Sequence, residues 1–523
     1  MERILKAQAK IDEEICTLKK RLQYLLTFRN SIALINQLPA EIFVHIFRSC
    51  QPASFGDRRG TKEICASQFD QWLHITQVCQ RWRSIAFGSK ELWTTIPMHN
   101  DVYAELAFKL SKPLPISIID TTNDVDEDDV EASSCDLYSS LLERAEKVEI
   151  RRSVGESYLV YALGEAHSVQ ELILDSLDIT YLSGSPFPAS LKSLTLSQCE
   201  FDWSWLELDQ LTELHIKAMD APEPVDFSWF VGHMQHLPSL CLLEVVNILR
   251  DDLEDPSFHL NLQHLVINDD ITLVSKLLSY VNLKPDFTLM VELLYQANLD
   301  EGQTLMLSLD HHLQASQHVI RHVVLDCEDE GRMALSNHKR GFSCQFFDQD
   351  PSNPFVHINA DVDTEMSRTW LDSILGLGMD QLQQLSVRGF SGVEEWRSWP
   401  FRDLHCLREL SMDTQSFDGF FECFVGDTLS ADESNDWDHV LFPALKELTF
   451  LDIHYDEQQE VQLADVLRMR RNHGYGLERL SFVGGNITDE PDGTELMIKV
   501  ADELTIKPAE GPRRARHDWR RKF

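Results

Sequence analysis

The feature that most constrains this fold is a short leucine-rich pattern that recurs along much of the 523-residue chain. The pattern is an apolar residue, two residues of any kind, a second apolar residue, one residue of any kind and a third apolar residue. Nine clean copies begin at Val169, Leu191, Leu211, Leu240, Leu262, Leu382, Leu407, Leu445 and Leu477, and weaker ones at Ala145 and Ile320. Nine copies in one chain are hard to attribute to chance.

The spacing of these copies indicates a solenoid. The step between the second apolar residues of successive copies is 22 residues from Leu172 to Leu194 and 20 residues from Leu194 to Leu214. Steps of this size are typical of leucine-rich repeats, in which each unit contributes one short strand. Alternate strand residues then point inward, and stacked units bury them in a continuous column. Because the turn asparagine of regular repeats is mostly missing, we expect an irregular leucine-rich-repeat solenoid over residues 99–505.

The repeat is hard to recognise from about residue 284 to 369. Phe342–Phe347 and Phe355–Ile358 have the composition of strands, and Trp370–Leu377 that of a helix. We interpret this stretch as degenerate repeats with insertions, and a separate domain is the alternative. We also expect a loop inserted between two repeats at Ser430–His439.

Residues 1–35 are predicted to form one helix. Isoleucine and leucine recur on it at heptad spacing, at Ile4, Ile11, Ile15, Leu18, Leu22 and Leu25. Charged residues surround this seam, as in a coiled coil, and Gln8 and Arg29 interrupt it at its ends. Two interpretations stay open. The helix dimerises the protein, or it folds back and braces the helices that follow.

The stretch from Leu38 to Ile96 contains two apolar halves. Pro39 suits the first helical position and Glu41 the positive end of the helix dipole. Apolar residues then recur at helical spacing, at Ile42, Phe43, Ile46 and Phe47 in the first half and at Ile75, Val78, Cys79, Trp82, Ile85 and Ala86 in the second. A module of about 60 residues buries only a limited part of its surface. The apolar face left over predicts a partner.

The order of residues in this stretch resembles an F-box: Leu38-Pro39-x-Glu41-Ile42, then Val78-Cys79-x-x-Trp82-Arg83, then Leu92-Trp93. The resemblance implies an F-box module over residues 36–98 that binds the Skp-type adaptor of cullin–RING (SCF) ubiquitin ligases. It assigns adaptor binding to Leu38, Pro39, Ile42, Ile46, Val78, Cys79 and Trp82. The link between the halves is longer than usual for the family, and we interpret residues 50–69 as a loop insertion containing Pro52, Gly56 and Gly60.

Composition restricts the ligands, the kinds of site and the cellular compartment that we expect. A formal net charge of −38 argues against nucleic-acid binding by the body of the chain. The 11 cysteines include no Cys-x-x-Cys pair, so neither disulfides nor a zinc site is predicted. Because no signal segment or long apolar run occurs, we expect a soluble protein of the cytoplasm, the nucleus or both.

Two charged segments flank these regions. The acidic run at residues 124–131 lacks the ligand pattern of a calcium loop, and we interpret it as solvated. Residues 506–523 are predicted to form a disordered tail rich in arginine. This basic tail is typical of a nuclear-localisation or anion-binding segment, and the alternative is that it lies on the acidic surface of the same chain.

No sequence pattern indicates an enzyme. Phosphate-binding glycine loops and the Gly-x-Ser-x-Gly nucleophile turn are missing, and the His318/His322 pair lacks the neighbouring glutamate of a zinc protease. We therefore expect no catalytic residue, metal or cofactor. The sequence predicts a helical N-terminus followed by an α/β solenoid, in a substrate-recognition subunit of an SCF-type ligase whose repeats bind a target protein. A non-degradative scaffold or other protein-interaction module is the alternative function.

Overall fold

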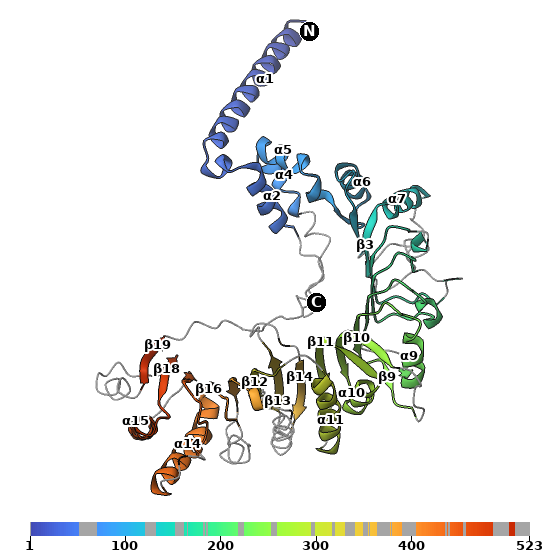
Figure 1. The fold of residues 1–523 in the computed structure, drawn as a ribbon. Helices are drawn as coiled ribbons and strands as arrows, with labels where there is room; N and C mark the ends of the chain where they lie inside the picture. The colour runs from blue at the N-terminus through green and yellow to red at the C-terminus, as the bar shows by residue number, and fades with distance from the viewer. Residues whose placement is uncertain are drawn as a thin grey trace, which may run out of the picture. The chain divides into compact units, whose positions relative to one another are not determined.

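The computed structural model (Figure 1) describes residues 2–51, 71–120, 132–151, 162–164, 166–180, 184, 187–217, 224–252, 259–293, 299–315, 319–329, 340–348, 354, 356–362, 377, 379–389, 404–434, 437, 440–452, 457–484 and 501–507. The acidic run, most of the 50–69 insertion, residues 508–523 of the basic tail and residues 370–376 of the expected helix lie outside these residues. The predicted start of the tail at residue 506 is wrong, because residues 506 and 507 belong to the strand Ala501–Lys507. Internal contacts divide the chain into two units, one within Met1–Gln210 and the other within Leu211–Trp519.

The first unit begins with helices and continues into a sheet. Its helical elements are α1 (Glu2–Ser31), η1 (Leu34–Gln37), α2 (Ala40–Ser49), α4 (Ile75–Val78), α5 (Gln80–Gly88), η2 (Lys90–Trp93), α6 (Asp101–Leu110), α7 (Ala132–Leu142) and η4 (Trp203–Leu206). Its strands are β1 (Thr95–Pro97), β2 (Ile116–Asp120), β3 (Ala145–Arg151), β4 (Glu171–Asp175) and β5 (Ser193–Ser197). These strands pair in chain order, and every pair is parallel.

The second unit is a longer sheet with helices packed beside it. Its strands are β6 (Glu213–Lys217), β7 (Val225–Asp226), β8 (Leu242–Val246), β9 (Leu249–Arg250), β10 (Leu260–Asp269), β11 (Val281–Leu293), β12 (His322–Asp329), β13 (Arg340–Phe347), β14 (Val356–Val362), β15 (Gln384–Arg388), β16 (Glu409–Asp413), β17 (Glu447–Leu451), β18 (Leu477–Val483) and β19 (Ala501–Lys507). Its helices are α9 (Phe227–Met234), α10 (Ile271–Ser279), α11 (Leu299–Ala315), η5 (Met379–Gln381), α14 (Thr414–Ser434) and α15 (Glu457–Asn472), and Figure 1 shows the α-helices on one side of the strands.

The stretch with the weakest repeat pattern belongs to this sheet. The strand order through it is β11–β14–β13–β12–β15, and β13 is antiparallel to both its neighbours, whereas the outer pairings are parallel. The strands expected near residues 342–347 and 355–358 are confirmed as parts of β13 and β14. Since these strands hydrogen-bond on both sides to repeat strands, the described strands within residues 284–369 belong to the same sheet, which favours insertion over a separate domain.

The predicted inward residues lie opposite one another. Leu172 pairs with Leu194, Leu214 with Leu243, and Leu243 with Leu265. Within the second unit the paired inward residues also include Leu385, Leu410, Leu448 and Leu480. All of these leucines are at most 1% exposed, so the repeat template correctly identified the buried column. The expected fold class, N-terminal helices followed by a long and largely parallel β/α region, is confirmed.

A left-handed turn replaces the missing turn asparagine. The residue directly after a strand has positive φ at Ser176, Gln198, Asn247, Gly389, Asp452 and Gly484. This conformation turns the chain away from the sheet, and several residue types adopt it here although glycine and asparagine do so most easily. In three of these turns the N–H donates to a carbonyl near the end of the neighbouring strand in the sheet, from Ser176 to Ser197, from Asn247 to Asn268 and from Asp452 to Val483. The same left-handed turn therefore recurs after these strands although the residue at the turn differs in type.

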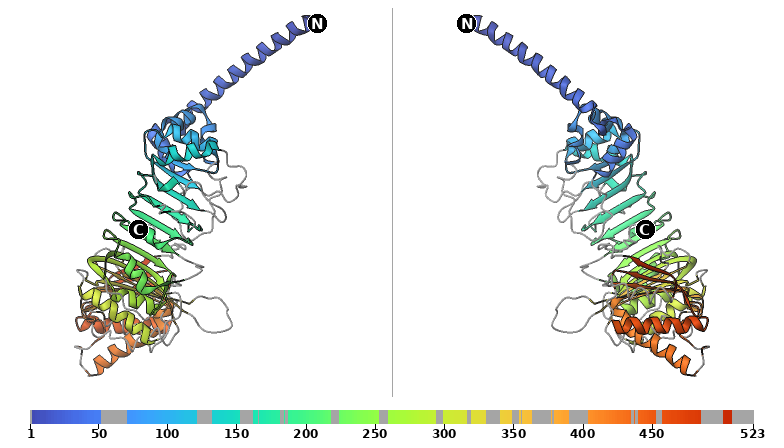
Figure 2. Two further views of the ribbon diagram at one scale, coloured as in Figure 1. Left: turned by 90° about the vertical axis from the view of Figure 1, so that its right-hand side faces the viewer. Right: turned by 90° about the vertical axis from the view of Figure 1, so that its left-hand side faces the viewer.

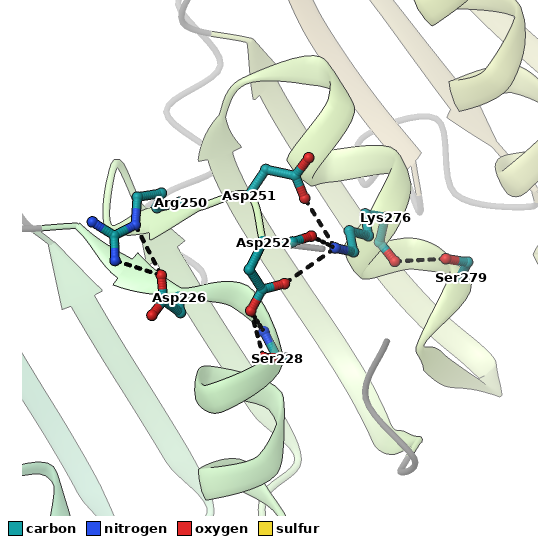
Figure 3. Close-up of polar contacts among 7 residues, drawn as sticks. All are labelled: Asp226, Ser228, Arg250, Asp251, Asp252, Lys276 and Ser279. Atoms are coloured by element: carbon teal, nitrogen blue, oxygen red, sulfur yellow. Dashed lines mark hydrogen bonds and ion pairs between the residues drawn. The ribbon is translucent and has the colours of Figure 1, made fainter. Parts of the chain in front are cut away.

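A polar cluster fixes the start of α9 in the second unit (Figure 3). The Asp252 carboxylate accepts the Ser228 backbone N–H at 2.9 Å and also the Ser228 hydroxyl. Lys276 donates to the Asp251 carboxylate at 2.9 Å and to the Asp252 carbonyl at 2.8 Å. We call Ser228, Asp251, Asp252 and Lys276 the Asp252 clip. Because Asp226 makes no side-chain cap to α9, a carboxylate from the next repeat satisfies an N–H in the first turn.

Two expectations about helices are wrong. The predicted loop at 430–439 is helical as far as Ser434, because α14 extends to that residue, and Trp437 beyond it is 8% exposed. The N-terminal helix ends at Ser31, and a separate 3₁₀ turn, η1, follows. α1 is nevertheless one uninterrupted helix of 30 residues (Figure 2), as the heptad pattern requires.

Candidate functional site

The N-terminal helical module, residues 36–98, is built around buried aromatic rings. Phe43 and Phe47 of α2 are fully buried, and each lies within 5.4 Å of Trp82 on α5, measured between ring centroids. Trp72 and Trp93 form a second contact at 5.3 Å. Edge-to-face and tilted contacts of this kind add to the burial of the rings. The aromatic rings therefore hold the two sequence halves together.

Hydrogen bonds connect the same halves across the insertion. The Trp72 indole donates to the Phe47 carbonyl at 2.9 Å, and the Trp82 indole donates to the Asn36 side chain at 2.8 Å. Arg81 donates to the Leu38 carbonyl at 2.9 Å, and its guanidinium lies 5.8 Å from the centre of the Phe43 ring. These contacts hold the Leu38-Pro39 segment beside α5, and they do not depend on the length of the insertion that separates the two halves in sequence.

The apolar stripe of α2 divides into an inner and an outer row. Phe43 and Phe47 point into the module, whereas Ile42 is 44% exposed and Ile46 is half-buried. A helix of ten residues that packs on one side can bury only part of so wide a stripe. The outer row is therefore available to a second protein.

Most predicted adaptor-binding residues are accessible. Pro39 and Val78 are exposed, Val78 by 55%, and Leu38, Cys79 and Trp82 are half-buried. Trp82 differs from the rest because its ring packs on Phe43 and Phe47 and its N–H is bonded, so it also stabilises the module. The structure brings the two halves together through α2 and α5, but assignment of these seven residues to an adaptor stays a prediction.

Two local expectations need correction. Pro39 precedes the helix instead of occupying its first position, since its ψ is 153° and its carbonyl accepts the Phe43 N–H at 3.4 Å. The second stripe is not one helix, because Cys79 is extended (φ −159°, ψ 169°) and separates α4 from α5. The helical periodicity across Cys79 is thus a coincidence of two short helices. Val78 is thereby exposed at the end of α4.

Sequence reasoning missed three contributors to the accessible apolar surface. Leu34 and Ile35, in the 3₁₀ turn before the Leu-Pro pair, are 82% and 44% exposed, and Phe87 on α5 is 37% exposed. Leu34 and Ile35 could have been found as apolar residues a few positions before the Leu-Pro pair. They extend the candidate interface toward the N-terminus.

Other kinds of site have little support in the described part of the chain. The described residues contain no group of three or more histidine, cysteine, aspartate or glutamate side chains arranged to hold a metal ion. None of the described helices combines the length and hydropathy of a membrane-spanning segment. A shallow cavity of about 390 Å³ lies beside the starts of β2 to β5, where Lys147 and Glu171 form an ion pair.

A family model described as F-box-like matches residues 35–98, which are the residues of this module. No match was found among curated proteins.

Proposed function

We propose that this chain is the substrate-recognition subunit of an SCF-type ubiquitin ligase. The observation that carries the proposal is the F-box-like match over residues 35–98, the same module that exposes Ile42 and Val78. An F-box-like domain implies a Skp-type adaptor as partner, and through that adaptor a cullin–RING ligase. The chain itself then supplies no covalent step. It raises the effective concentration of the target beside the ubiquitin-conjugating enzyme.

The outward face of the second unit supports a role in target binding. Strands β15 to β19 align a row of hydroxyl side chains, Ser386, Ser411, Thr449, Ser481 and Thr505, through successive paired positions. A parallel row beside it contains Gln384, Glu409, Glu447, Arg479 and Glu503. A polar, partly exposed sheet face of this kind offers directional hydrogen bonds to a protein ligand.

Adaptor binding is tested with two matched variants of the full chain. Val78→Asp places a charge within the module, and Val102→Asp places one on α6, outside it, at a valine that is 80% exposed. We expect Val78→Asp to abolish co-purification with a Skp-type adaptor and Val102→Asp to leave it unchanged. Circular dichroism checks that both variants fold.

The proposal would be refuted if the intact, folded chain failed to bind the adaptor. It would also be refuted if both valine variants bound the adaptor as the wild type does. Where adaptor binding holds, depletion of the protein in cells is expected to stabilise its targets. Targets whose lifetimes do not change would favour a non-degradative scaffold.

A further inference from the structure

The apolar seam of α1 has no covering surface in the described part of the chain. Its members are Ile4, Ile11, Ile15, Leu18, Leu22 and Leu25, and each is between 43% and 65% exposed. A row of six large aliphatic side chains in water is unfavourable, and exposed apolar stripes of this size mark interaction sites. The structure therefore does not support the interpretation that this helix folds back on the module behind it.

Heptad positions follow from the spacing of the seam. Ile15 and Leu18 are three residues apart and Ile11 and Ile15 four apart, which assigns Ile15 to position a and Leu18 to position d. The a positions are then Gln8, Ile15, Leu22 and Arg29, and the d positions are Ile4, Ile11, Leu18 and Leu25. The seam thus fits a two-stranded coiled coil between copies of α1.

The core residues discriminate between the two orientations of such a coil. In a parallel pair each a residue meets its own copy, so two Arg29 side chains would face each other. In an antiparallel pair a meets d, which places Arg29 against the partner's Ile4. Ile15 then meets the partner's Leu18, and Leu22 meets the partner's Ile11. The antiparallel arrangement therefore keeps the centre aliphatic and avoids a like-charge contact.

The flanking charges point to the same orientation. Positions g carry Glu14 and Arg21, and positions e carry Asp12 and Lys19. Antiparallel helices pair g with g and e with e, so Glu14 meets the partner's Arg21 and Asp12 meets the partner's Lys19, each twice by symmetry. In parallel helices position g pairs with position e of the partner, and the only attractive pair among these four residues is Glu14 with the partner's Lys19. Within the described chain, none of these four side chains forms an ion pair or hydrogen bond, so all are available to a second copy.

We propose that α1 pairs with the α1 of a second copy of this chain as an antiparallel coiled coil. A helix of 30 residues is about 45 Å long. The chain segments that leave its C-terminal ends therefore lie at opposite ends of the coil. Each dimer would then present two F-box-like modules and two repeat regions, which favours bivalent capture of a multivalent target. This proposal does not depend on adaptor binding.

The first experiment tests dimer formation by sedimentation velocity of the full chain over a range of concentrations. We expect a wild-type dimer, and a monomer for the double variant Ile15→Asp/Leu18→Asp. Both side chains are exposed in the single chain, so helical content and adaptor binding should be unchanged in this variant. A wild type that stays monomeric, binds another protein through α1 instead, or dimerises equally with the double variant would overturn the proposal.

The second experiment tests orientation with two charge exchanges of equal composition. In Glu14→Arg/Arg21→Glu the antiparallel g pairs are reversed but remain attractive, so the dimer should persist. In Glu14→Lys/Lys19→Glu every antiparallel flanking pair becomes repulsive, and the dimer should be about tenfold weaker or more. A parallel coil predicts the opposite order of the two variants, and that order would overturn the antiparallel assignment.

Discussion

The two rows of α2 predict different consequences for two mutations five residues apart. Phe47 is fully buried between Phe43 and Trp82, and truncation of such a phenylalanine to alanine costs about 3–5 kcal/mol. Ile42 is 44% exposed, so Ile42→Ala removes a smaller packing contribution, roughly 1 kcal/mol. Phe47→Ala should therefore unfold the module locally, whereas Ile42→Ala should leave it folded and weaken only adaptor binding.

Hydrogen exchange measured by mass spectrometry resolves this difference in the full chain, because it reports opening element by element. A loss of 3–5 kcal/mol corresponds to faster exchange in residues 40–49 by roughly 10²-fold or more, and a loss of 1 kcal/mol to less than about tenfold. Peptides from α10, in the second unit, serve as the internal control and should exchange at the wild-type rate in both variants.

A single result would refute the reasoning about α2. If Phe47→Ala exchanges like the wild type in residues 40–49, Phe47 is not a packing residue and the inner and outer rows are wrongly assigned. Adaptor binding measured on the same samples completes the test. Ile42→Ala should lose affinity without losing protection, a combination that a purely structural role of Ile42 does not produce.

Two further predictions concern the second unit. Gly474 follows α15 at φ 93° and Gly232 lies within α9, and a Cβ at either position meets no atom within 4 Å. Gly474→Ala should therefore lower the free energy of unfolding by about 1 kcal/mol through backbone strain, whereas Gly232→Ala should raise it by about 0.5–1 kcal/mol, as measured by thermal denaturation. Equal effects of the two substitutions would contradict the assignment of strain to the positive φ of Gly474. Burial alone would raise the pKa of Asp252, but hydrogen bonds from Ser228 and Lys276 outweigh it and lower that pKa below its ordinary value. The Asp252 clip should therefore stabilise the fold fully above about pH 4, and this stabilisation should be lost as the pH falls through the lower pKa of the folded state. In acid the melting temperature of Asp252→Asn should then approach that of the wild type. A difference in melting temperature that stays constant with pH would refute the role of the charge.

Buried positions were the most predictable part of this fold. Leu172, Leu194, Leu410 and Leu448 were recognisable because a stacked solenoid accepts only apolar residues at its inward positions. The turns were not recognisable, since the same left-handed backbone is adopted by Gln198, Asp452 and Gly389 alike. Backbone geometry leaves little trace in the sequence where several residue types can adopt it.

Prediction from sequence was limited in a similar way within the N-terminal helical module. Helical periodicity identified both apolar halves but could not separate Phe43 from Ile42, because both residues lie within one wide stripe. It also continued through Cys79, where the chain is extended. The exchange of β12 and β14 in the sheet order depends on pairings between distant segments, which no local pattern encodes. Tertiary contacts decide each of these points.

The contrast between inward and outward residues also indicates where specificity resides. Along β15 to β19 the inward column is uniformly apolar, so exchanging its members would change stability more than recognition. The outward rows combine Ser411 and Thr449 with Glu447 and Arg479, whose type the fold does not restrict. Burial and, next, the neighbouring Glu409 raise the pKa of Glu447, while the guanidinium of Arg479, which forms an ion pair with it, acts in the opposite direction. Because the fold does not restrict the residue types in the outward rows, these rows are where target specificity should be sought by mutation.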